Sequence, residues 1–247
     1  MMGCIMKEQH TKRTLFISIG ANILLLFIIG FIFIKFDGIV GVNAGLEKPN
    51  NLKRSGFHYQ ERTTLFNELT IPPDSIVFLG DSLTFRTEWS ELFPEEIVIN
   101  RGIGRDTTAG VLKRLDHIIE AKPKKIFILI GVNDLKSRKS VSATIHNYAT
   151  IITSIQSRSP KTDIFIQSLL PVNNKKYGNI LSNDTIKTMN TDLQALAKKT
   201  GVQYIDLYSA FSQNDQLPDK YTVDGIHLTG EGYILWRESI KQYVHEK

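Results

Sequence analysis

The chain has 247 residues, of which 42% are hydrophobic and 22% charged, with a formal net charge of +5. Its aromatic and branched residues exclude wholesale disorder, and its single cysteine, Cys4, excludes an intrachain disulfide and a cysteine-based zinc site. No long basic run and no alternation of basic with aromatic residues occurs, so nucleic acid is not an expected partner.

An uncharged run of 20 residues near the N-terminus, from Leu15 to Ile34, has the length of a membrane span. As a helix it rises about 30 Å, which matches the hydrocarbon core of a bilayer. The charges are positive before the run and balanced after it, so the positive-inside rule places residues 1–14 in the cytoplasm and the rest of the chain outside. We therefore predict a single-pass cell-membrane protein with a transmembrane signal-anchor helix over residues 15–36.

A cleaved signal peptide is the alternative, because Val42-Asn43-Ala44 offers small residues for cleavage shortly downstream. The apolar part of a signal peptide usually spans about 7–15 residues, so the longer run favours an uncleaved anchor. Both interpretations export the remainder of the chain, and secretion after cleavage near Ala44 stays open. Residues 37–56 contain several Gly and Asn residues and are predicted to be a linker.

From residue 57 onward, short apolar runs alternate with stretches of helical periodicity. The apolar runs are rich in Ile, Val and Phe, as are strands buried on both faces of a parallel sheet. This alternation predicts one α/β domain over residues 57–247, a doubly wound three-layer α/β/α sandwich. The predicted strands are Ser75–Leu79, Ile97–Asn100, Lys125–Ile130, Asp163–Gln167 and Val202–Ile205.

The helical stretches carry recognisable end signals. Asp106 or Thr107 is placed to cap the start of the first helix, and Gly201 to end the third. Apolar residues recur in each at helical spacing, which predicts one buried face per helix. The predicted helices are Thr107–Lys122, Val141–Arg158, Asp184–Lys199 and a last one that starts near Thr229.

Ligands of open parallel sheets bind at the carboxyl ends of the strands, so the loops after the strands form the candidate site. After the first strand, Gly80-Asp81-Ser82-Leu83 places a serine where a helix is expected to begin, and the N-terminus of that helix would favour negative charge. Alone this motif is weak, because a serine in such a turn is commonly a cap. The Gly-x-Ser-x-Gly elbow is absent, since Thr84 takes its last position.

Three further loops carry residues that suit a serine nucleophile. The segment of residues 100–107 comes after the second strand and can supply a backbone N–H, but it lacks the third glycine of a dinucleotide site. Asn133 comes after the third strand, and its side-chain amide can donate to an oxyanion. His227 is the one histidine with a carboxylate three residues before it, Asp224, so the pair can supply a base and its orienting anion.

Together these loops resemble the sequence blocks of the GDSL, or SGNH, hydrolase superfamily. Ser82 stands in the serine block, Asn133 in the Gly-x-Asn-Asp block, and Asp224 with His227 in the Asp-x-x-His block. The resemblance implies an SGNH hydrolase fold, with a flavodoxin-like parallel sheet of five strands. Residues 100–108, 168–173 and 224–229 are similar to the branch that contains platelet-activating-factor-acetylhydrolase-like and sialate O-acetylesterase-like proteins.

The resemblance implies a serine esterase that works through an acyl-enzyme. Ser82 is the expected nucleophile, His227 the base and Asp224 the carboxylate that orients it. This chemistry requires no metal and no organic cofactor. The expected substrate is a small-molecule or glycan ester, with a short acyl group such as O-acetyl on a carbohydrate or lipid.

The expected oxyanion hole consists of the backbone N–H groups of Ser82 and Arg105 and the side chain of Asn133. Here the sequence departs from the family, because the oxyanion glycine of the family falls on Arg105, with Gly104 as the neighbouring alternative. A backbone N–H survives this change, whereas the arginine side chain either faces solvent or contacts an anionic group of the substrate.

Two other functional classes stay open. The same triad can transfer an acetyl group to a sugar hydroxyl, which would make the protein a carbohydrate O-acetyltransferase. A non-catalytic surface-binding domain is the second alternative, since a fold does not fix a function. No sequence feature indicates the oligomeric state.

Overall fold

The computed structural model describes residues 51–246, and from residue 56 onward also their side chains. Five strands form one parallel sheet in the order β2-β1-β3-β4-β5. This is the predicted flavodoxin-like order, in which the chain reverses direction across the sheet between β1 and β3. The strands are β1 (Ile76–Gly80), β2 (Val98–Gly102), β3 (Lys125–Leu129), β4 (Asp163–Gln167) and β5 (Gln203–Ile205).

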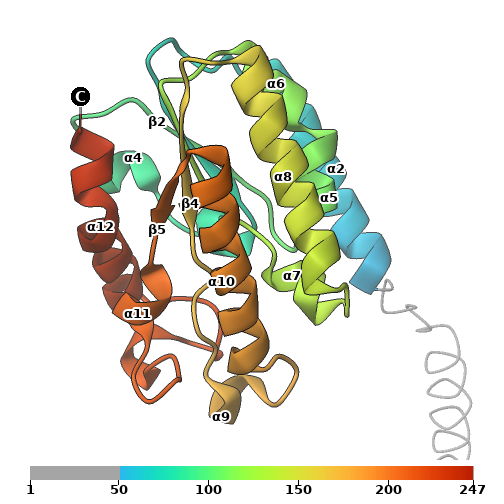
Figure 1. The fold of residues 1–247 in the computed structure, drawn as a ribbon, viewed down its shortest axis with the longest axis vertical. Coiled ribbons are helices and arrows are strands. Elements are labelled where there is room, and N and C mark those ends of the chain that lie inside the picture. Colours follow the sequence, from blue (N-terminus) through green and yellow to red (C-terminus); the bar gives the residue numbers. More distant parts are fainter. Residues whose placement is uncertain (1–50, 247) are drawn as a thin grey trace, which may run out of the picture. The chain divides into compact units, whose positions relative to one another are not determined.

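Helices cover both faces of the sheet (Figure 1). Because strand side chains alternate, Val77 and Leu79 belong to one buried cluster while Ile76 and Phe78 belong to the other. Helices α5, α6, α8 and α10 supply the first cluster, and α4, α11 and α12 supply the second. Because both faces of the sheet are buried, the strand sequences are continuous apolar runs and do not alternate with polar residues.

The helices begin and end at the signals present in the sequence. Thr107, Ser140 and Thr229 each accept a backbone N–H as N-cap, and Gly201 ends α10 in the left-handed conformation at φ 72°. The helices are α2 (Asn51–Glu68), α3 (Ser82–Phe85), α4 (Trp89–Leu92), α5 (Thr108–Lys113), α6 (Leu115–Glu120), α7 (Val132–Lys136), α8 (Val141–Arg158), α9 (Asn174–Tyr177), α10 (Asn183–Thr200), α11 (Leu207–Phe211), the 3₁₀ helix η1 (Asp219–Tyr221) and α12 (Gly230–His245).

Two predicted elements differ from the structure. Helix α2 begins at Asn51, so the last part of the predicted linker, residues 51–56, is helical. The predicted helix Thr107–Lys122 is interrupted at Arg114, which leaves helical geometry at φ −122° and ψ 12° and separates α5 from α6. The buried guanidinium of Arg114 bonds to groups outside the helix, and this explains the break.

The predicted membrane segment lies outside the described part of the chain. Residues 1–14, the apolar run to residue 36 and the candidate cleavage site near Ala44 all precede residue 51. Between residues 51 and 246, no helix has the length and apolar character needed to cross a membrane.

Candidate active site

Three side chains from opposite ends of the domain sequence meet beyond the carboxyl end of β1. The Oγ of Ser82 lies 3.0 Å from Nε2 of His227, although the two residues are 145 positions apart. The Nδ1 of His227 lies 2.6 Å from Oδ2 of Asp224. If Nδ1 carries the proton, Nε2 is left as an acceptor facing the serine hydroxyl. The predicted nucleophile, base and orienting carboxylate therefore form one continuous hydrogen-bonded chain.

The loop that carries Asp224 and His227 is fixed by its own backbone. The hydroxyl of Thr222 donates to the carbonyl of His227 at 2.9 Å and accepts the N–H of Gly225 at 2.9 Å. Gly225 has φ 95°, and a Cβ there would stand 2.6 Å from the backbone N of Tyr177. Glycine is needed at this position both for the conformation and for the close approach. The loop thus presents Asp224 and His227 in one defined orientation.

The carboxylate of Asp224 is held in its charged form. Partial burial pushes its pKa up, but hydrogen bonds from the side chain and backbone of His227 and from the N–H of Ile226 outweigh that effect, and the net pKa is lowered. The Asp224 side chain is 48% exposed and that of His227 17% exposed. The pair is therefore an ionised, half-exposed carboxylate beside a mostly buried imidazole.

Ser82 is the first residue of α3, and Asp81 precedes it as the N-cap, accepting the N–H of Leu83 at 3.0 Å. The sequence predicts that the N-terminus of this helix favours negative charge. This stays a prediction, for a helix of only four residues. Complete burial raises the pKa of Asp81 to about 7, despite the hydrogen bond from Leu83.

The predicted oxyanion residue Arg105 lies in a tight turn after β2. The N–H of Asp106 donates to the carbonyl of Ile103 at 3.1 Å, and Arg105 stands at φ 67° in third position of this turn. Positive φ at that position is the pattern of a type II turn, which favours glycine. Arg105 thus adopts a backbone conformation suited to the glycine of the family, whereas the neighbouring alternative, Gly104, has no left-handed φ.

We expect the free energy of unfolding of Arg105→Gly, measured by urea denaturation, to be about 1 kcal/mol higher than that of Arg105→Ala. A left-handed conformation costs a residue with a Cβ about 1–2 kcal/mol, and the added freedom of glycine in the unfolded chain offsets only part of this gain. Both variants remove the arginine side chain, so the comparison isolates the backbone. Arg86, at φ −85°, is the matched control, and there alanine should be the more stable of the two. Equal free energies of unfolding for Arg105→Ala and Arg105→Gly would contradict the expectation that a non-glycine residue is strained at this positive φ.

The side chain of Asn133, the third predicted oxyanion donor, bonds to two neighbouring loops. Its Nδ2 donates to the carbonyl of Asp106 at 2.9 Å and to Oδ2 of Asp81 at 3.3 Å. Asn133 therefore ties the serine loop and the Arg105 turn together. An oxyanion beside Ser82 would compete with Asp81 for the Nδ2 hydrogen of Asn133 that makes the 3.3 Å bond.

Sequence reasoning missed the buried ion pair that supports these loops. Arg114 donates through Nε to Oδ2 of Asp106 at 2.9 Å, and its other nitrogens reach the carbonyls of Arg101 at 2.9 Å and Gly80 at 3.2 Å. Its guanidinium thereby joins the ends of β1 and β2 to the start of α5. The available signal was an arginine at a position of the helix that the apolar spacing assigns to the buried face.

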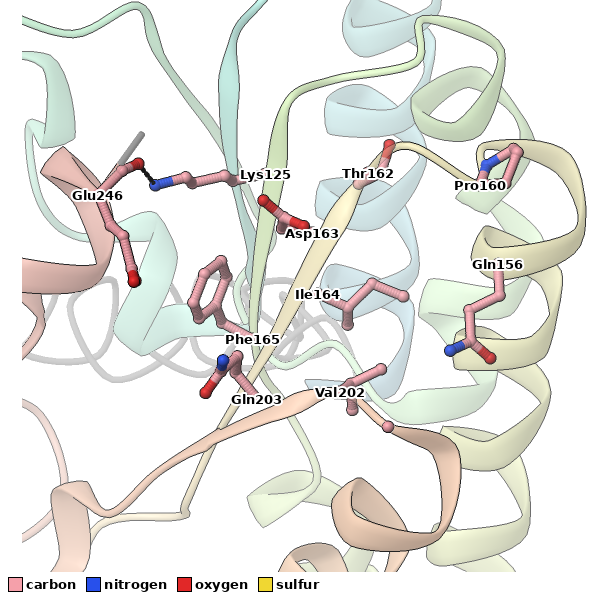
Figure 2. Close-up of a pocket in the computed structure, with 11 residues that line it drawn as sticks. Lys125, Gln156, Pro160, Thr162, Asp163, Ile164, Phe165, Val202, Gln203 and Glu246 are labelled. Carbon is pink, nitrogen blue, oxygen red and sulfur yellow. Dashed lines mark hydrogen bonds between the residues drawn. The ribbon is translucent and has the colours of Figure 1, made fainter.

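A separate cavity of about 330 Å³ lies at the opposite edge of the sheet (Figure 2). Its lining includes Lys125, Asp163 and Gln203, which are the first residues of β3, β4 and β5. The Lys125 ammonium is already engaged, because it donates to the carbonyls of Tyr243 and Glu246 at the end of α12. This cavity is remote from Ser82, which lies just past the carboxyl end of β1, and it contributes nothing to the triad.

Comparison with known proteins identifies the family of the chain. Residues 78–235 match the GDSL-like lipase/acylhydrolase family. The platelet-activating factor acetylhydrolase IB subunit alpha2 of Rattus norvegicus is 32% identical over 168 residues, which cover 65% of this chain and 71% of that protein.

Two solved structures share both the fold and at least 25% sequence identity with this chain. A Streptococcus pneumoniae protein that carries a platelet-activating-factor name is 31% identical with a TM-score of 0.73, covering 83% of this chain and 99% of its own. A GDSL-like lipase from Bacteroides thetaiotaomicron is 25% identical with a TM-score of 0.66, covering 76% and 97%. The chain therefore belongs to the GDSL-like lipase/acylhydrolase family and is an enzyme of the ester-hydrolysing class.

Proposed function

We propose that the protein is a serine esterase that cleaves short acyl esters through an acyl-enzyme, with Ser82, His227 and Asp224 as its triad. The observation that carries this proposal is the unbroken hydrogen-bonded chain, 3.0 Å from Ser82 to His227 and 2.6 Å from His227 to Asp224. Nucleophile, base and orienting anion in this order are what acyl transfer by serine requires.

In the first half-reaction, Nε2 of His227 takes the hydroxyl proton while Oγ of Ser82 attacks the ester carbonyl. The resulting imidazolium is stabilised by the carboxylate of Asp224, which keeps its charge at neutral pH because its pKa is lowered. Collapse of the tetrahedral intermediate passes the proton to the leaving alcohol and leaves the acyl group on Ser82. Water, deprotonated by the same histidine, then releases the acid.

The backbone N–H groups of Ser82 and Arg105 and the side chain of Asn133 are the proposed oxyanion donors. The positive φ of Arg105 supports its part, because this residue keeps the backbone shape that suits a glycine. Loss of a single oxyanion donor typically lowers turnover by about 10²–10³.

The proposed substrate carries a short acyl group, such as O-acetyl, on a carbohydrate or lipid. The name of the Rattus norvegicus relative specifies an acetylhydrolase, which supports the short acyl group. The hydrophobic run of residues 15–34 supports a membrane-anchored protein whose catalytic domain lies outside the cytoplasm. Secretion after cleavage near Ala44 is the alternative.

The test is an acyl-chain series of p-nitrophenyl esters, measured on the full chain in detergent micelles. We expect turnover to be highest for the acetate and to fall by roughly tenfold or more toward the octanoate, as a short acyl pocket requires. A serine-directed phosphonate should label Ser82 and stop the reaction. Absent turnover together with absent labelling would favour the non-catalytic domain, and an acetylated product in the presence of a sugar acceptor would favour the O-acetyltransferase.

A further inference from the structure

Helix α2 precedes the residues that match the family, yet it lies on the same side of the molecule as α5, α6 and α8 (Figure 1). Its Tyr59 hydroxyl donates to the carbonyl of Gly110 at 2.7 Å. Gly110 in turn packs so tightly against Asp106 that an added Cβ would stand 1.9 Å from Oδ1 of that residue. Through Gly110, α2 is therefore connected to the end of the Arg105 turn.

The neighbouring residue of α2, His58, reaches the other end of this turn. Its Nε2 stands 3.2 Å from where a Cβ on Gly104 would lie, so the imidazole packs directly on the glycine before Arg105. The same ring meets Phe85, the last residue of α3, edge to face at a centroid distance of 5.3 Å. His58 thus fills the space between the helix that begins with Ser82 and the turn that carries Arg105.

The turn needs external support, because a non-glycine residue at positive φ persists only where its surroundings hold it. We infer that His58 and Tyr59 are positioning residues, which hold the turn of residues 103–106 so that the N–H of Arg105 faces the oxyanion. This inference rests on the proposed function and extends it to a helix outside the family match. No sequence pattern assigns a role to His58.

Helix α2 has an attachment of its own that does not involve His58 or Tyr59. Phe66 is 4% exposed, and the guanidinium carbon of Arg101 in β2 lies 4.6 Å from the centre of its ring. Substitutions at positions 58 and 59 should therefore leave α2 in place and remove only its contacts with the turn of residues 103–106 and with Gly110.

The test compares His58→Ala, His58→Phe and Tyr59→Phe in the full chain. We expect His58→Ala and Tyr59→Phe to lower kcat by about tenfold to a hundredfold with little change in KM, since small misplacement of an oxyanion donor affects the transition state most. His58→Phe keeps a ring against Gly104 and Phe85 and should restore most of kcat. The control is Thr64→Ala, because the Thr64 hydroxyl bonds to carbonyls of its own helix.

Hydrogen exchange of the peptide that spans residues 102–107 gives a readout that does not depend on turnover. We expect faster exchange in His58→Ala than in the wild type, and a smaller loss of kcat from His58→Ala when Arg105→Gly has removed the strain of the turn. An unchanged kcat in both His58→Ala and Tyr59→Phe overturns the inference, and so does unchanged exchange. If Ser82→Ala retained full turnover, the proposed function would fail, while the exchange measurement would still decide whether α2 holds the turn.

Discussion

Ser82→Ala is expected to lower kcat for a short-chain aryl ester by about 10⁴–10⁶ while the domain stays folded. The hydroxyl is the atom that forms the acyl bond, and its observed contact is the 3.0 Å hydrogen bond to Nε2 of His227. Removing one partly buried oxygen from a turn leaves the packing of β1 and α3 intact. Initial rates with p-nitrophenyl acetate and a thermal melt of the same sample measure the two effects separately.

Ser157→Ala is the matched control for this experiment. Ser157 lies exposed on α8, and its hydroxyl bonds to the carbonyl of Ser154 within the same helix. Turnover and melting temperature should both stay at the wild-type values in this variant. Undiminished turnover in Ser82→Ala would remove Ser82 as the nucleophile and with it the proposed acyl-enzyme.

Arg114→Met is expected to lower the free energy of unfolding by about 3–5 kcal/mol, because it leaves the carboxylate of Asp106 buried without its partner. The side chains of Arg114 and Asp106 are 5% and 2% exposed, and Nη2 lies 2.8 Å from Oδ2. Methionine fills a similar length but donates to neither the carboxylate nor the carbonyls of Arg101 and Gly80. In a domain of this size the melting temperature should fall by roughly 10 °C.

A second substitution distinguishes the unpaired charge from lost packing. Arg114→Met combined with Asp106→Asn removes both charges and should recover part of the lost stability, since the buried carboxylate is then absent. The control is Arg158→Met, which breaks exposed ion pairs to Asp116 and Glu120 and should leave the melting temperature nearly unchanged. A melting temperature for Arg114→Met equal to that of Arg158→Met would contradict a supporting role for the buried pair.

Local sequence signals predicted most of the secondary structure. The predicted strand Asp163–Gln167 and helix Val141–Arg158 have the same bounds in the structure, and α12 starts at Gly230, next to the predicted start near Thr229. Apolar runs and capping residues act over a few positions, which is why a single sequence reveals them. Helix α2 was missed because its sequence is polar and carries no clear apolar stripe.

The exceptions arise where distant groups decide a local conformation. The apolar spacing of Val111, Leu115 and Ile118 predicted one continuous helix, yet the bonds of Arg114 to Gly80, Arg101 and Asp106 interrupt it. Likewise, no rule of spacing shows that α3 ends after four residues or that Arg105 accepts a positive φ. Each outcome depends on partners that the fold supplies from other elements.

The sequence by itself determined which loops carry the candidate chemistry, because the carboxyl ends of parallel strands must lie at one edge of their sheet. Only the tertiary structure decided that Ser82 meets His227 across 145 positions, and that Asn133 bonds to both neighbouring loops. It also placed His58 of α2 against the turn of Arg105. Local patterns reflect forces between near neighbours in the chain, whereas the distances between these side chains are set by packing of the whole domain.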